Sequence, residues 1–165
     1  MVKGQKFFIR GLKSDPLILK VVNLLMKSGK RSKAEKILYK TLQSLDKEYP
    51  GKALHILYLA IIAVKQDIAV RLKPKSQKRG KSPSFNVYLP RVISPSRGLN
   101  IGIRSLIKAS RERSQSFFIP FCESLKQELV EASKNKGSVV EKRYKASELA
   151  LSNKRRVHFK MGRYN

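Results

Sequence analysis

The chain has 165 residues, of which 37 are lysine or arginine and 11 are aspartate or glutamate, so its formal net charge is +26. This length suits one domain with a sizeable core, and the 41% apolar content excludes a wholly disordered chain. So large an excess of positive charge argues against an ordinary cytosolic enzyme, because it promotes indiscriminate binding to polyanions. Nucleic acid or an anionic membrane surface is the usual partner of such a protein. A membrane partner is not expected here, because no strongly amphipathic helix carries lysines opposite aromatic residues.

A membrane-spanning or disulfide-bonded protein is not expected. The single cysteine, Cys122, excludes an intramolecular disulfide and indicates a reducing or redox-indifferent location. The longest apolar run, residues 53–64, is interrupted by His55 and is too short to cross a bilayer as a helix. No secretory signal peptide is predicted, because the apolar residues 7–9 are followed at once by Arg10.

The first two predicted helices are preceded by an extended basic arm, residues 1–14. Asp15 and Pro16 predict the start of the first helix, as N-cap and first helical residue, and Gly29 is expected to stop it. Ser32 and Glu35 have the spacing of a capping box that opens the second helix. Two basic groups flank these elements. The arm carries Lys3, Lys6, Arg10 and Lys13, and the turn between the helices carries Lys27, Lys30, Arg31 and Lys33.

A third helix, about residues 52–66, is apolar nearly all round and is therefore predicted to be central. The stretch that follows, Ile68 to Arg111, contains no acidic residue. Its apolar runs Ile68–Leu72 and Phe85–Leu89 predict two strands, and the prolines and glycine between them predict an extended tip. A basic β-arm that awaits phosphates is favoured over a basic loop without a partner. This β-arm carries Arg71 and Lys73, and its tip carries Lys75, Lys78, Arg79 and Lys81.

Three further helices are predicted in the C-terminal half. Ser94 and Pro95 open the fourth helix, whose apolar residues face the core and whose opposite face presents Arg97, Arg104, Lys108 and Arg111. The fifth helix follows Pro120 and runs to about residue 136, where Gly137 stops it. A second capping box, Ser138 to Glu141, opens the last helix, which extends to about residue 157. This helix is basic and includes Lys142, Arg143, Lys154, Arg155 and Arg156.

The predicted fold is mostly α: a six-helix bundle with a protruding basic β-hairpin between the third and fourth helices. We expect a basic N-terminal arm (1–14), a single helical domain (15–160, with the hairpin at about 68–90) and a short tail (161–165). The four basic clusters are the N-terminal arm, the turn between the first two helices, the Ile68–Arg111 stretch and the C-terminal region. Together they favour phosphate binding over merely solvated surfaces.

Catalytic chemistry has little support in the sequence. His55 and His158 have no acid spaced to orient them, and His55 is predicted to be a core or boundary residue. Cys122 is expected to be a small buried hydrophobe, and no cysteine or histidine spacing suits zinc. We therefore predict neither an enzyme nor a cofactor or metal site. Aromatic residues near the cations could stack on bases, although a core position is favoured for Tyr144 and Phe85 and remains open for Tyr164.

Three segments of the chain resemble small-subunit ribosomal protein seven, a family with bacterial, mitochondrial and plastid members. The first runs from Asp15 to Thr41 and contains Gly29-Lys30-Arg31 between two apolar pairs. The second runs from Pro95 to Arg113, and the third combines Asn135-Lys136-Gly137 with Lys142-Arg143 and later residues near 153–159. The resemblance spans about residues 13 to 160 and implies the same helical bundle with a β-hairpin.

The resemblance implies a structural protein that binds the 3′ major domain of small-subunit rRNA and nucleates assembly of the ribosomal head. The implied hairpin reaches toward exit-site tRNA and the mRNA exit path, with head and platform proteins as neighbours and one copy per ribosome. The family's rRNA contacts would correspond to Lys30, Arg31, Arg71, Lys73, Arg97, Arg104, Arg111, Arg113, Lys136 and Arg143.

Departures from the family pattern favour an organellar member. The hairpin tip is longer and more basic than in bacterial members, Val87-Tyr88-Leu89-Pro90 replaces the usual second-strand sequence, and residues 114–121 match poorly. A mitochondrial location is expected, with a plastid or the bacterial cytoplasm as alternatives. The alternative function is a free-standing DNA-binding protein that uses the turn at Gly29 as a helix-turn-helix, although Glu35 at the start of the second helix would repel phosphates.

Overall fold

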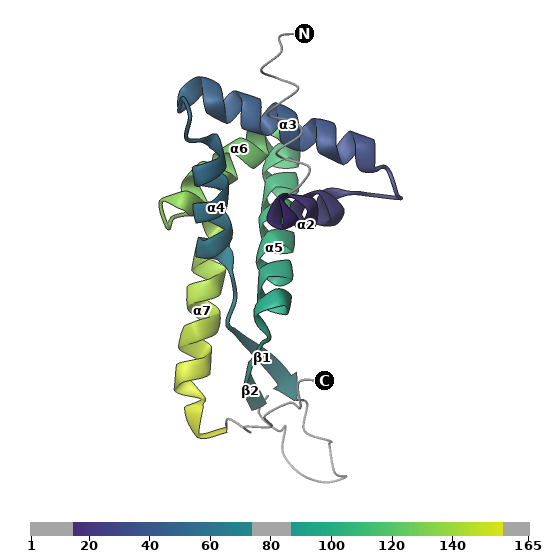
Figure 1. Ribbon diagram of the computed structural model, residues 1–165. Coiled ribbons are helices and arrows are strands. Elements are labelled where there is room, and N and C mark those ends of the chain that lie inside the picture. Colours follow the sequence, from purple (N-terminus) through teal and green to yellow (C-terminus); the bar gives the residue numbers. More distant parts are fainter. Residues whose placement is uncertain (1–14, 74–86, 157–165) are drawn as a thin grey trace.

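The computed structural model describes residues 15–73 and 87–156. Within these residues the chain forms a helical body and one two-stranded hairpin (Figure 1). The elements in chain order are α2 (Pro16–Leu25), α3 (Arg31–Glu48), α4 (Ala53–Val64), β1 (Ile68–Lys73), β2 (Val87–Val92), α5 (Pro95–Phe117), α6 (Phe121–Ser133), α7 (Ser138–Ser152) and a 3-10 turn, η1 (Lys154–Arg156). The predicted class is confirmed: six α-helices, with the hairpin between the third and the fourth.

Two of the predicted helix starts are confirmed. The Asp15 carboxylate accepts a hydrogen bond from the backbone N–H of Leu17 at 2.8 Å, and Pro16 occupies the first helical position. Ser94 is the N-cap residue of α5, again with a proline directly after it. Proline suits this position because it lacks the backbone N–H, which would have no partner inside the helix there, and because its φ is already helical.

Both predicted capping boxes are wrong. α3 begins at Arg31, one residue before the expected cap Ser32, and no side chain of the described residues caps its first turn. Glu35 instead accepts a hydrogen bond from Arg31 Nε at 2.9 Å. In the same way, α7 begins at Ser138 itself, with Gly137 as its N-cap residue at a φ of 99°. In each case the serine has already entered the helix, so its hydroxyl cannot accept a bond as an N-cap does.

Several predicted ends also shift. α2 ends at Leu25, four residues before Gly29, which lies with Ser28 in the left-handed region of a separate turn. α6 ends at Ser133 and α7 at Ser152, both earlier than predicted. β2 starts at Val87 and continues to Val92, because it pairs antiparallel with all of β1, with Ile68 opposite Val92. The predicted strand residue Phe85 lies outside the described residues.

All six helices contribute buried apolar side chains to one core, and α4 contacts α3, α5, α6 and α7. The prediction that this helix is central is confirmed for one face, where Leu57, Ala60 and Val64 are almost completely buried. Its other face is open, since His55 is exposed and Ile62 is 65% exposed. The predicted core or boundary position of His55 is therefore wrong. The predicted core position of Tyr144 is also wrong, because this side chain is exposed on α7. Cys122 is half-buried and not fully buried.

The helices place the hairpin at the end of the body opposite α3 (Figure 1). α7 packs against both β1 and β2, and η1 packs against β2. At the hairpin base the start of α5 lies close to the segment that follows α4: a Cβ added at Gly98 would overlap the carbonyl oxygen of Gln66. No residue larger than glycine fits there without a backbone shift, so this glycine lets the start of α5 pass beside the chain that leads into β1.

Candidate nucleic-acid interface

The turn between α2 and α3 presents a compact group of cations. Lys27, Lys30, Arg31 and Lys33 are all exposed. Arg31 is engaged by Glu35 on the same helix face. The three lysines have no ion-pair partner among residues 15–73 and 87–156. They are therefore available to an external anion, beside a helix N-terminus that favours negative charge.

A second group lies along α5. Arg97, Arg104, Lys108 and Arg111 are exposed, and their spacing places them along one stripe of the helix. The opposite side of α5 buries Ile103, Leu106 and Ile107 against the core. Lys108 lies 3.8 Å from Glu112, but both side chains are mostly exposed, and such a surface pair contributes little.

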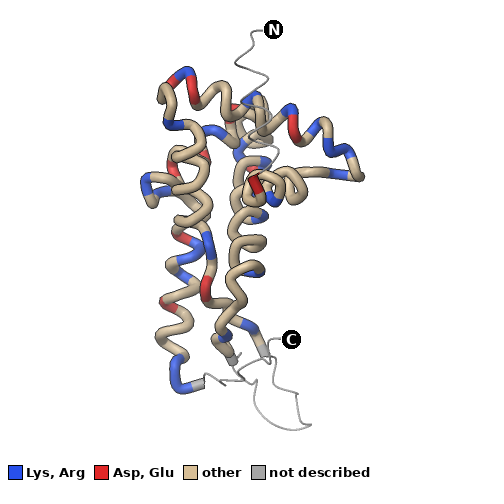
Figure 2. Tube along the Cα trace, viewed as in Figure 1, with Lys and Arg blue, Asp and Glu red and all other residues tan. Residues whose placement is uncertain are grey.

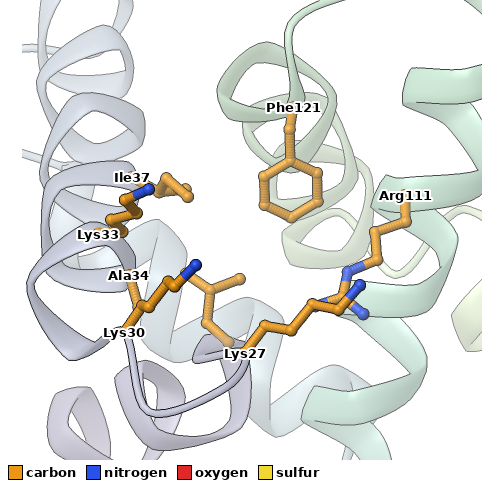
Figure 3. Close-up of a pocket in the computed structure, with 8 residues that line it drawn as sticks. Lys27, Lys30, Lys33, Ala34, Ile37, Arg111 and Phe121 are labelled. Atoms are coloured by element: carbon orange, nitrogen blue, oxygen red, sulfur yellow. The ribbon is translucent and has the colours of Figure 1, made fainter.

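The tertiary structure joins these two groups into one surface, which we call the turn–α5 surface. Arg111 lines the same pocket as Lys27, Lys30 and Lys33. The apolar side chains of that pocket come from α2, α3 and α6, and Figure 3 shows Arg111 across the cavity from Lys30 and Lys33. Figure 2 shows lysine and arginine both at this turn and along α5. Two stretches about eighty residues apart in the chain thus contribute cations to the same pocket.

A further basic area surrounds the hairpin base. Arg71 on β1 and Arg91 on β2 are exposed, and the contact of η1 with β2 brings exposed Lys154 and Arg155 to the same end of the molecule. Lys136 and Lys142 are also exposed, at and after the turn between α6 and α7. The side chains of Lys73 and Arg156 lie outside the described part of the structure. The predicted sites in the N-terminal arm (Lys3, Lys6, Arg10, Lys13) and at the hairpin tip (Lys75, Lys78, Arg79, Lys81) lie outside the described residues.

Arg113, which the resemblance assigns to rRNA, has internal partners. Its Nη1 and Nη2 donate to the two carboxylate oxygens of Glu131 at 2.6 and 2.7 Å. Nη2 also lies 2.7 Å from Glu128, whose side chain is only 5% exposed. The hydrogen bonds to Glu131 raise the pKa of Arg113. Burial raises the pKa of Glu128 above its usual value, although Arg113 opposes that shift. The ion pairs of Arg113 therefore join α5 to α6.

Arg143 also has an internal partner. Its Nη1 donates to the carbonyl oxygen of Ala63 at 2.8 Å. Ala63 lies in the last turn of α4, where carbonyl groups have no partner within the helix, and a cation there is favourable for the helix dipole. The guanidinium also lies 5.8 Å from the ring centroid of exposed Tyr144. The side chain therefore caps α4 from α7.

Other kinds of site find no support in the part of the chain that the structure describes. No group of three or more histidine, cysteine, aspartate or glutamate side chains there could hold a metal ion. None of the helices over the same residues is long and apolar enough to span a membrane.

Sequence reasoning missed the apolar contribution to the turn–α5 surface. Phe121, at the first position of α6, lines the pocket between the cations. A pattern of charge cannot reveal such a residue, because its proximity to Lys30 depends on how α6 packs against α3. Arg91 was also absent from the predicted sites, although it is exposed on β2; its place in the acid-free stretch was the available signal.

Comparison with known proteins gives a consistent result. Residues 3–154 match the family described as Ribosomal protein S7p/S5e. The chain is 31% identical over 159 residues to "Small ribosomal subunit protein uS7" of Sulfurihydrogenibium sp. (strain YO3AOP1), covering 96% of both chains. It is 32% identical over 160 residues to the protein of that name from Shewanella sediminis (strain HAW-EB3), again covering 96% of both. A third relative of that name, from Dichelobacter nodosus (strain VCS1703A), is 31% identical over 157 residues, covering 92% of this chain and 94% of its own.

Proposed function

Since this chain belongs to the ribosomal protein S7p/S5e family, we propose that its exposed arginines and lysines bind small-subunit rRNA. The chain is a structural, non-enzymatic component of the small ribosomal subunit. The observation that carries the proposed binding surface is the meeting of Arg111 with Lys27, Lys30 and Lys33 around one pocket. A rigid helical body that holds cations from separate segments together can bind phosphates of a folded RNA without first ordering a loop.

The proposed mechanism is electrostatic. Cationic side chains neutralise rRNA phosphates and release condensed counterions, so the affinity of the free protein falls steeply as salt rises. The turn–α5 surface and the area around the hairpin base are the two proposed contact regions. The predicted contacts through the N-terminal arm, Lys73, Arg113, Arg143 and Arg156 stay predictions; for Arg113 and Arg143 the internal bonds support a positioning role first.

We further propose that binding nucleates assembly of the ribosomal head, and that one copy acts within each ribosome. In this proposal the hairpin extends from the body toward exit-site tRNA and the mRNA exit path, and head and platform proteins are its neighbours. The placement of β1 and β2 at the end of the body remote from α3 supports a projecting role (Figure 1).

A mitochondrial ribosome is the proposed location. The support is the set of departures from the bacterial pattern, namely the long basic tip and the altered second strand. Fractionation of the source cells tests this proposal. Recovery of the tagged protein with mitochondrial ribosomes is expected, and recovery with plastid or bacterial ribosomes would assign it elsewhere.

Sedimentation tests the function itself. The tagged chain should co-sediment with small ribosomal subunits through a sucrose gradient and leave them only at high salt or on denaturation. A free soluble pool that protects DNA from nuclease would instead support the helix-turn-helix alternative. The latter outcome would remove the rRNA-binding proposal.

The hairpin tip is tested by charge-neutral replacement of Lys78, Arg79 and Lys81 with glutamine. The helical body should unfold as before, whereas RNA binding or translation by reconstituted ribosomes should weaken. Replacement of Lys36, Lys40 and Lys47, exposed on α3, removes the same charge elsewhere and is the matched control. Equal effects of the two triple variants would leave the tip without a specific role.

A further inference from the structure

The turn–α5 surface contains a pocket that combines two chemistries. Four cations, Lys27, Lys30, Lys33 and Arg111, line it together with the apolar side chains of Leu25, Ala34, Ile37 and Phe121. None of the lining side chains within residues 15–73 and 87–156 is acidic. We propose that this pocket receives one unpaired nucleotide of the bound RNA, with the base against Phe121 and the flanking phosphates on the cations. The inference rests on the proposed rRNA binding and adds to it a defined seat for a single base.

The floor of the pocket suits a planar apolar group. Leu25 and Ala34 are buried, while Ile37 and Phe121 are partly buried and pack against the core. Figure 3 shows the Phe121 ring between the α3 side chains and Arg111. A ring held in this way loses little freedom when a base stacks on it, and such stacking tolerates any base identity.

The rim of the pocket suits phosphates on both sides of that base. Lys30 and Lys33 project from the start of α3, Lys27 from the preceding turn and Arg111 from α5, so the cations surround the cavity (Figure 3). A nucleotide inside a chain has one phosphate on its 5′ side and another on its 3′ side, and two separated groups of cations match that arrangement. Among the residues that the structure describes, none caps the first turn of α3 with its side chain, and the N-terminus of this helix favours an anion.

The size and composition of the cavity favour a nucleotide over a phosphate alone. Its volume is about 350 Å³, at the low end of the range of about 300–1,000 Å³ found for small-molecule sites. A site for bare phosphate would need no aromatic floor. A fully paired helix could bring phosphates to the rim but no base to the floor. RNA recognition often depends on bases splayed from loops and bulges onto aromatic side chains.

The test compares two RNA duplexes that differ only by one bulged nucleotide, each titrated with the full chain. The wild-type chain should bind the bulged duplex about tenfold more tightly, a ratio within the range expected for stacking of one base. Phe121→Leu keeps an apolar floor but removes the stacking surface, so the preference should fall toward one. Phe118→Leu is the matched control, because Phe118 is 95% exposed at the same helix junction and does not line the pocket. Its preference for the bulge should persist.

A second pair of variants separates the pocket from general charge. Substitution of Lys27, Lys30 and Lys33 by glutamine should weaken binding of the bulged duplex more than substitution of Lys36, Lys40 and Lys47. Both sets remove three charges from exposed positions, but only the first set lines the pocket. Circular dichroism should show the same helix content for both.

Ultraviolet crosslinking identifies the contact directly. The bulged nucleotide should crosslink to the peptide that contains Phe121, and mass spectrometry would read the site. A wild-type chain that binds RNA but does not distinguish the duplexes would overturn the pocket proposal and leave the proposed function intact. Failure to bind either duplex or a transcript of the 3′ major rRNA domain would overturn both. Displacement of bound RNA from Phe121 by an acidic peptide, without any preference for the bulge, would assign the pocket to a protein segment.

Discussion

The phenolic hydroxyl of Tyr58 on α4 donates a hydrogen bond to the carboxylate of Asp15, the N-cap residue of α2. The other carboxylate oxygen accepts from the backbone N–H of Leu17. One aspartate therefore begins α2 and also joins it to the central helix. This aspartate therefore also helps to position the proposed interface, because α2 leads directly into the turn that carries Lys27 and Lys30.

Replacing Tyr58 by phenylalanine should lower the free energy of unfolding by about 1.5–3 kcal/mol at neutral pH, the range for hydrogen bonds to charged groups. The bond to Tyr58 lowers the pKa of Asp15 from its usual 3.8. Its stabilising effect is therefore fully present above pH 3.8 and is lost as pH falls through the lowered value. The bond also raises the pKa of Tyr58 from 10.0 to about 12, so the effect is also lost as pH rises from 10.0 through about 12.

Urea denaturation followed by circular dichroism at several pH values measures this difference. Tyr39→Phe is the control, because no hydrogen bond of its hydroxyl is found in the described part of the chain. A difference between wild type and Tyr58→Phe that persists unchanged at pH 2.5 would contradict the assignment.

The ion pairs of Arg113 with Glu128 and Glu131 should contribute strongly to stability, because the side chain of Glu128 is buried. Arg113→Met should cost about 3–5 kcal/mol, the usual penalty for removing one partner of a buried ion pair, since it leaves Glu128 nearly enclosed without its cation. The folded state raises the pKa of Glu128 above 4.5. It therefore holds that proton more tightly than the unfolded chain does, and stability falls as pH rises from 4.5 through the raised value.

Glu128→Gln cannot titrate, so it should gain stability relative to wild type as pH rises from 4 to 7. Thermal unfolding at the two pH values measures the trend. A loss of relative stability over this interval would mean that the charged form of Glu128 is the favoured one.

Gly102→Ala should destabilise the protein, although alanine normally improves a helix interior by about 1 kcal/mol relative to glycine. A Cβ at this position would lie 2.5 Å from the carbonyl oxygen of Val64, a backbone atom that cannot turn aside. Overpacking of this kind costs about 1–3 kcal/mol. Chemical denaturation measures the sign of the change. Ser96→Ala, exposed on the same helix, is the control, and a stabilised Gly102→Ala variant would refute the close approach of α5 to α4.

The turn–α5 surface should determine the salt dependence of RNA binding. Each phosphate contact contributes about 0.7–0.9 to the slope of log affinity against log salt. The double variant Arg104→Gln, Arg111→Gln should therefore have a slope smaller by about 1.4–1.8. Filter binding to a 3′ major domain transcript between low and moderate salt measures it. Lys40→Gln with Lys47→Gln removes equal charge from α3, and equal slopes for the two variants would remove α5 from the interface.

Local chemistry explains which structural features could be predicted from sequence. Asp15-Pro16 and Ser94-Pro95 predicted two helix starts correctly, because a cap and a proline act on the backbone within a few residues. The position of the hairpin was also predicted correctly, because two apolar runs separated by prolines and a glycine are a local feature of the sequence. The two serine capping boxes failed because a neighbouring residue, Lys30 or Gly137, already occupied the position before the helix.

The sequence by itself determined the partner class, the helical class and the position of the hairpin, since net charge and apolar periodicity are properties of composition and local order. Only the tertiary structure decided how the cations are used. It brings Arg111 to the lysines of the α2–α3 turn, and it occupies Arg113 and Arg143 with internal acceptors. It also places Phe121 among the cations. These outcomes depend on contacts between helices that are far apart in the chain. The packing of buried side chains determines those contacts, and the sequence pattern of the exposed residues does not reveal it.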